Sequence, residues 1–134
     1  MIINHKYKFI FHKTKKTGGT SMEIALSKFT SDSDVVTVIS HDKEEAMRKN
    51  LGKTNKYSLK LGTHSRVPEL LKFLQLPEFK QKDIFNSYFK FTILRDPVDT
   101  FISEYFYLFR NPGPRTPNIN QWIKNLKDSD KSDV

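Results

Sequence analysis

Short apolar runs alternate with segments of helical periodicity along this chain. Residues 8–12 (KFIFH) form an apolar run that predicts a buried strand, and a polar loop with two glycines follows at residues 13–19. From Met22 to Phe29, apolar residues recur at the spacing of one helix face. The start of the chain therefore predicts a strand, a loop and a helix in that order.

The same alternation continues toward the C-terminus. Further strands are predicted at residues 34–39 and 88–94, and residues 57–61 suit a short strand. Segments with helical pattern or composition lie at residues 41–50, 67–74, 77–87, 97–109 and 118–127. Strands that alternate with helices indicate a three-layer α/β fold, in which helices flank a mainly parallel sheet. We expect one domain over residues 1–127 and a polar tail over residues 128–134.

Composition then narrows the class of protein. The chain of 134 residues has no cysteine, which excludes disulfides, thiolate metal sites and a cysteine nucleophile. It has no apolar run of the ~18 residues that a membrane span needs, and its N-terminus lacks a signal-peptide pattern. A cytoplasmic location is therefore expected. The net charge of +8 indicates an anionic partner, which at this point includes nucleic acid, a nucleotide and an anionic membrane.

The first strand-to-helix junction has the composition of a phosphate-binding loop. Gly18 and Gly19 allow the backbone to approach a ligand closely, and the following helix directs unpaired amides at the loop. Lys16 adds a full charge, and the hydroxyl donors are Thr17, Thr20 and Ser21. Because the lysine precedes the glycines, this is not a Walker A loop. An ordinary capped helix after a glycine turn would have the same residues.

A second junction of this kind lies at residues 93–97. Asp96 suits the N-cap of a helix, and Pro97 suits its first position. Ser103 lies about two turns into that helix, so it and Arg95 can converge on one anionic group. A guanidinium and a hydroxyl together suit a phosphate. Taken alone, the pattern equally describes a surface arginine and an ordinary helical serine.

Together, the two junctions resemble those of sulfotransferases that use 3′-phosphoadenosine 5′-phosphosulfate (PAPS). The sequence KTGGTS at residues 16–21 resembles the 5′-phosphosulfate loop of that family, and LRDPVDTFISEY at residues 94–105 resembles its 3′-phosphate motif. The segment between them is similar to small sulfotransferase-like proteins of bacteria and their viruses. The resemblance covers residues 7–110 and implies a P-loop-NTPase-like sulfotransferase core.

The resemblance also implies a role for single residues. Lys16 would contact the bridging and 5′-phosphate oxygens and stabilise the leaving group, while Arg95 and Ser103 would hold the 3′-phosphate. The residues implied to hold the 5′-phosphate are Thr17, Gly18, Gly19, Thr20 and Ser21. The sulfuryl group would pass in line to a hydroxyl or amine of an acceptor such as a sugar, a peptide or a small alcohol. No metal is implied.

Transfer to such an acceptor also needs a base for its proton. His64 precedes the helix predicted at residues 67–74 and resembles the base position of several family members, although a loop histidine without a function would look the same. Glu23 is the competing base because it lies one turn after the glycine loop. The spacing of Thr20 and Glu23 is also that of a capping box, which would account for Glu23 without catalysis.

Two other functions fit parts of this pattern. Family domains usually continue beyond this length, so the domain is expected to be minimal or C-terminally truncated. A protein that binds PAPS or its product without turnover is therefore an alternative to an enzyme. A basic nucleic-acid-binding module is disfavoured, because only generic charge and aromatic content support it. The sequence predicts a nucleotide and an acceptor as partners, with no nucleic acid and no membrane span, and it predicts no oligomeric state.

Overall fold

The computed structural model describes residues 1–39, 41–51 and 67–129. The chain divides into two compact units, Met1–Leu94 and Arg95–Val134. The strand predicted at residues 57–61 and the candidate base His64 lie outside the described residues. The prediction of a single domain over residues 1–127 stays a prediction.

The first unit is built on a four-stranded mixed sheet in the order β3-β1-β2-β4. The strands are β1 (Ile2–Asn4), β2 (Phe9–Phe11), β3 (Val35–Val36) and β4 (Phe89–Phe91). β1 pairs antiparallel with both β2 and β3, whereas β2 and β4 run parallel. The predicted α/β class is confirmed, but the sheet is mixed rather than mainly parallel. The difference arises from β1, which the sequence pattern did not predict and which joins β2 through a short turn.

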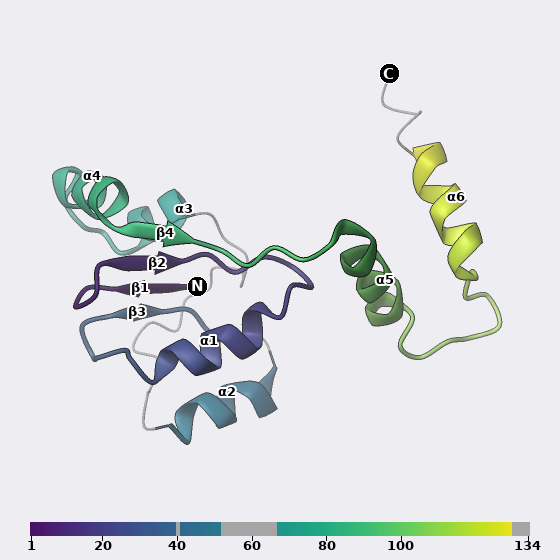
Figure 1. Cartoon of the computed structure of the whole chain (residues 1–134), viewed down its shortest axis with the longest axis horizontal. Coiled ribbons are helices and arrows are strands. Elements are labelled where there is room, and N and C mark those ends of the chain that lie inside the picture. The colour runs from purple at the N-terminus through teal and green to yellow at the C-terminus, as the bar shows by residue number, and fades with distance from the viewer. Residues whose placement is uncertain (40, 52–66, 130–134) are drawn as a thin grey trace. The chain divides into compact units, whose positions relative to one another are not determined.

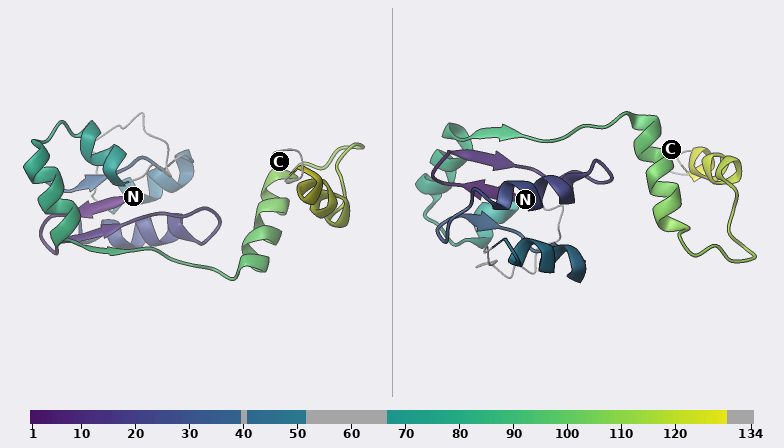
Figure 2. Two further views of the ribbon diagram at one scale, coloured as in Figure 1. Left: turned by 90° about the horizontal axis from the view of Figure 1, so that it is seen from above. Right: turned by 60° about the horizontal axis from the view of Figure 1, so that its bottom comes forward.

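Helices cover both faces of this sheet (Figure 1, Figure 2). On one face, α1 (Gly19–Ser27) packs Met22 and Leu26 against the sheet, and α2 (Asp42–Lys49) lies beside α1. On the other face lie α3 (Val67–Phe73) and α4 (Glu78–Ser87). The buried cluster under these two helices comprises Met1, Ile3, Ile10, Val35, Leu71, Ile84 and Tyr88. The first unit therefore has the three layers that the sequence predicts.

The strands β2, β3 and β4 are each shorter than the run that predicted them. β3 covers only part of the predicted residues 34–39. The amide of Thr37 still binds the carbonyl of Met1 at 3.0 Å, and the amide of Ile39 then binds the side chain of Glu45 at 3.0 Å. β4 ends at Phe91, where its partner β2 also ends. The amide of His12 still binds the carbonyl of Phe91 at 2.9 Å, and the chain then leaves the sheet.

The second unit contains α5 (Pro97–Leu108) and α6 (Ile119–Ser129). Asp96 caps α5 as predicted, because its carboxylate accepts hydrogen bonds from two amides of the first turn, and Pro97 is the first helical residue. Aromatic side chains join the two helices. Trp122 stacks on Phe101 with ring centroids 4.3 Å apart, and Tyr105 lies 5.4 Å from Trp122.

Candidate functional site

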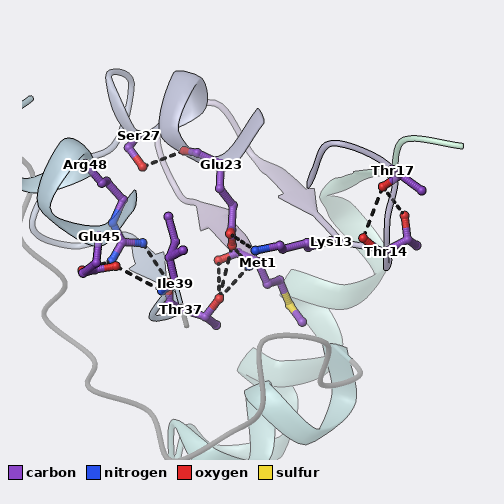
Figure 3. A network of polar contacts seen from close by, with 10 residues as sticks. All are labelled: Met1, Lys13, Thr14, Thr17, Glu23, Ser27, Thr37, Ile39, Glu45 and Arg48. Carbon is purple, nitrogen blue, oxygen red and sulfur yellow. Dashed lines mark hydrogen bonds and ion pairs between the residues drawn. The ribbon is translucent and has the colours of Figure 1, made fainter. Parts of the chain in front are cut away.

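The loop between β2 and α1, residues 12–18, leaves the sheet at the edge where β4 also ends, because these two strands are parallel neighbours. Thr14 holds this β2–α1 loop in place. Its hydroxyl donates to the carbonyl of Ile93 at 2.8 Å. The same hydroxyl lies 2.9 Å from that of Thr17, which donates to the carbonyl of Thr14 at 3.2 Å (Figure 3). The loop is therefore tied to the end of β4 and to itself.

The backbone of this loop includes two residues in the left-handed region. Lys16 has a φ of 58° and Gly18 has a φ of 79°. Glycine adopts this conformation freely, whereas a residue with a Cβ pays roughly 1–2 kcal/mol. Apart from the adjacent residues, no heavy atom of the described part of the chain lies within 4 Å of the position that a Cβ on Gly18 would take. The backbone at Gly18 is therefore open to a ligand.

The first turn of α1 supplies hydrogen-bond donors beside this loop. Gly18 is the N-cap, and the amide of Met22 binds its carbonyl at 3.2 Å. The amides of Gly19, Thr20 and Ser21 consequently have no carbonyl partner within the helix. No acidic residue stands in this first turn, so the positive end of the helix dipole is not neutralised by the residues of that turn.

The capping box predicted for Thr20 and Glu23 is wrong. The helix begins at Gly19, and its N-cap residue makes no side-chain hydrogen bond to the amides of the first turn. Glu23 is instead fully buried, and its carboxylate accepts from Nζ of Lys13 at 3.0 Å. The other carboxylate oxygen contacts the ammonium of Met1 and the hydroxyl of the threonine that follows β3 (Figure 3). Because its carboxylate is fully buried and both oxygens contact other groups of the fold, Glu23 does not face an acceptor, which argues against a role as the catalytic base.

The lysines of the loop lie in different surroundings. Lys15 is exposed and Lys16 is partly exposed, whereas Lys13 is buried. A Cβ on Gly19 would lie 2.7 Å from Cγ of Lys13, so the side chain of Lys13 occupies the space that any larger residue would need. The sequence placed Lys13 only at the start of a polar loop. Its position immediately after a buried strand was the one signal that its side chain turns inward.

The structure places the predicted site residues in two groups. The residues that follow one another on the β2–α1 loop and the first turn of α1 are Lys16, Thr17, Gly18, Gly19, Thr20 and Ser21. Arg95 and Ser103 belong to the second unit, where Arg95 precedes the N-cap of α5 and Ser103 lies within that helix. Nε of Arg95 lies 4.0 Å from the carboxylate of Asp99. In the described part of the chain, no three His, Asp or Glu side chains gather as ligands of a metal ion would.

The comparisons with known proteins agree with this picture. The sequence model of the sulfotransferase family matches residues 1–132, a span that includes both strand-to-helix junctions. No curated protein and no solved structure matches the chain significantly. None of the helices in the described residues has the length and apolar character of a membrane span.

Proposed function

The chain belongs to the sulfotransferase family, and we propose that it transfers a sulfuryl group from PAPS to a hydroxyl or an amine of an acceptor. Family membership supports sulfotransferase activity in general, whereas the donor and the acceptor chemistry are parts of the proposal. The observation that carries it is the β2–α1 loop. There a left-handed glycine and the free first turn of a helix coincide with the sequence KTGGTS.

The loop suits the 5′-phosphate of such a donor. Three consecutive amides, from Gly19 to Ser21, have no carbonyl partner within α1, and the open backbone at Gly18 leaves room for an anion. A run of amides at a helix N-terminus is a common phosphate-binding arrangement. The order of strand, loop and helix beside a parallel strand also supports the proposal of a P-loop-NTPase-like core. A cytoplasmic location stays part of the proposal.

Individual residues of the loop then take different roles. When bound, PAPS supplies the sulfuryl group, which passes in line to the acceptor atom. Lys16 neutralises negative charge on the phosphate that remains, which is the main electrostatic demand of such a transfer. Thr17 contributes its backbone amide rather than its hydroxyl, because the hydroxyl already contacts Thr14. Thr20 and Ser21, which are partly or fully exposed, add their hydroxyl groups.

The remaining roles rest on the sequence motifs alone. We assign the 3′-phosphate to Arg95 and Ser103, because a guanidinium and a hydroxyl at this spacing match the family motif. His64 is assigned as the base that takes the proton of the acceptor, since its place before α3 resembles the base position of other members. The acceptor is a sugar, a peptide or a small alcohol.

A thermal-shift comparison tests the donor. The product nucleotide 3′,5′-ADP should raise the Tm more than 5′-AMP or ATP does, since at equal concentration the ligand that binds more tightly stabilises the folded state more. Lys16→Gln should remove most of this shift. Lys28→Gln, which removes an exposed lysine from the other end of α1, should leave it intact. An equal shift with ATP, or no shift with any nucleotide, would contradict the proposed donor.

Turnover separates an enzyme from a protein that only binds the nucleotide. Release of 3′,5′-ADP from PAPS should require an acceptor, and a mixture of sugars, peptides and alcohols provides the first screen. His64→Ala should abolish this release while 3′,5′-ADP still raises the Tm. Full activity of His64→Ala would remove the histidine from the proposal and keep the donor assignment.

A further inference from the structure

A buried ion pair connects the β2–α1 loop to α1. Lys13, in the loop, extends its side chain to Glu23 on the helix, with 3.0 Å between Nζ and Oε2 (Figure 3). The side chain of Lys13 is 7% exposed and that of Glu23 is 0% exposed. The pair is therefore shielded from water, and its charges face each other instead of a ligand.

The aliphatic part of Lys13 lies against the first residue of α1. Its Cγ stands 2.7 Å from the place of a Cβ on Gly19, and its Cδ stands 3.6 Å from that place. The far end of the same side chain is held by Glu23, four residues further along the helix. Lys13 consequently spans the first turn of α1. Its position constrains how the loop meets the amides that we propose as phosphate donors.

The pair also matters for the electrostatics of the site. An unpaired carboxylate at Glu23 would lie about one helical turn from the free amides of α1, and it would oppose an anion bound there. Such a repulsion is stronger in a buried environment than in water. Lys13 and the ammonium of Met1 both contact this carboxylate, so its charge is neutralised locally.

From this geometry we propose that Lys13 and Glu23 are positioning residues for the anion site. They do not touch the bound nucleotide. They hold the β2–α1 loop and the first turn of α1 in the relative position that binds its phosphate. The inference rests on the proposed function, because it concerns the same site. It adds that the loop needs a buried lysine in addition to Lys16, and that Glu23 serves the site without taking a proton.

The affinity of the folded protein for two anions tests this role. Calorimetric titration with 3′,5′-ADP and with inorganic pyrophosphate gives a Kd for the wild type, for Lys13→Met and for Lys15→Met. Lys15→Met is the matched control, because it removes the same charge from an exposed position of the same loop. Lys13→Met should lower the affinity for both ligands about tenfold or more, since a small displacement of a binding group loses much of its interaction with the ligand. Lys15→Met should weaken them less than about threefold, through lost long-range attraction.

A double variant separates positioning from stability. Lys13→Met leaves a buried carboxylate with one partner fewer, so its Tm should fall. Lys13→Met/Glu23→Gln removes both charges of the pair, and the amide oxygen introduced at position 23 can still accept from the buried ammonium of Met1. The Tm should therefore recover in part, while the Kd stays weak because the tether to the helix is gone. If the Kd returned to the wild-type value together with the Tm, the pair would only balance charge, and the positioning role would be wrong. If Lys13→Met does not fold, the double variant carries the same comparison.

The two ligands distinguish failure of this inference from failure of the proposed function. If the wild type bound pyrophosphate but not 3′,5′-ADP, PAPS would be overturned as the donor. The Kd for pyrophosphate would still test the role of Lys13 and Glu23. Binding of neither ligand would overturn both proposals. If the wild type bound both ligands, and Lys13→Met and Lys15→Met lost affinity equally, only the positioning role would be overturned. Circular dichroism at the titration temperature confirms that each variant is folded.

Discussion

Thr14 donates its hydroxyl to the main-chain carbonyl of Ile93 across 2.8 Å, and this bond joins the loop after β2 to the chain that leaves β4. The two segments leave the sheet at the same edge because β2 and β4 are parallel neighbours. In such sheets the carboxyl ends of parallel strands are the usual place for a ligand. Thr14 therefore fixes the glycine-rich loop to the end of the strand that precedes the second sequence motif.

Replacing Thr14 with valine should destabilise the first unit and loosen the loop. Thr14→Val keeps the shape of the side chain but leaves the carbonyl of Ile93 without this donor, which should lower the free energy of unfolding by about 1 kcal/mol. Urea titration followed by circular dichroism measures the change. Thr92→Val is the control, because the hydroxyl of Thr92 is exposed and lies 3.5 Å from that of Thr14. Equal losses in the two variants would contradict a special role of the Thr14 bond.

A methyl group at Gly19 should destabilise the first unit. The new Cβ would meet Cγ of Lys13 at 2.7 Å, and that atom belongs to a side chain held at its far end by Glu23. Gly19→Ala should therefore lower the free energy of unfolding by about 1–3 kcal/mol, the usual cost of overpacking. Gly113→Ala is the control, because among the described residues other than its chain neighbours nothing lies within 4 Å of its added Cβ. Thermal unfolding monitored by circular dichroism measures both.

The clash at Gly19 also predicts a coupling between two positions. In a Lys13→Ala background the obstructing Cγ is absent, so Gly19→Ala should lower the free energy of unfolding less there than in the wild type. Residues in contact usually show such non-additive effects. If Gly19→Ala were equally costly in both backgrounds, the side chain of Lys13 would not be what excludes a Cβ at this position.

Local sequence signals predicted the elements that carry the motifs. Asp96 and Pro97 define the start of α5 because a cap and a first-turn proline act through neighbouring residues alone. The three-residue strand β1 was not predicted, because so short an apolar segment has no periodicity of its own. Its pairing with β2 and β3 made the sheet mixed. Strand order of this kind depends on contacts between distant segments.

In the candidate site, too, the features that depend on neighbouring residues were predictable and those that depend on distant contacts were not. Gly18 and the hydroxyl residues that follow it were recognisable, since a left-handed turn before a helix demands glycine. The pairing of Lys13 with Glu23 was not recognisable, because a polar loop and a capping box gave each residue a surface explanation. Arg48 was hidden in the same way. It lies in a charged helix, yet it is buried and donates to the carbonyl of Thr37 at 2.8 Å.

The stability of the first unit should fall at alkaline pH through Tyr88. Burial, together with the carboxylates of Asp83 and Asp34, raises the pKa of Tyr88 above its ordinary value. The unfolded chain therefore loses this proton first, so the stabilisation is present below about pH 10 and is lost as the pH rises through the raised value. Its hydroxyl lies 2.8 Å from Nδ1 of His5.

Urea titrations at about pH 8 and about pH 11 measure this contribution. Tyr88→Phe should lose less stability between the two pH values than the wild type does. Tyr7→Phe is the control, because Tyr7 is 55% exposed and should follow the wild type. If Tyr88→Phe and the wild type lost the same amount, the alkaline decrease would come from other groups.

Arg95 should determine the preference for a nucleotide with a 3′-phosphate. Under the proposed function, its guanidinium binds a group that 3′,5′-ADP carries and 5′-AMP lacks. Arg95→Gln should therefore lower the affinity for 3′,5′-ADP by about tenfold or more, as expected for loss of a charge-assisted contact. The affinity for 5′-AMP should stay nearly unchanged. The ratio of the two Kd values, measured by calorimetry, would then approach unity. Arg110→Gln removes an exposed arginine from the same unit and should keep the wild-type ratio. A ratio in Arg95→Gln that equals the wild-type ratio would assign the 3′-phosphate to other residues, because the two ligands differ only in that group.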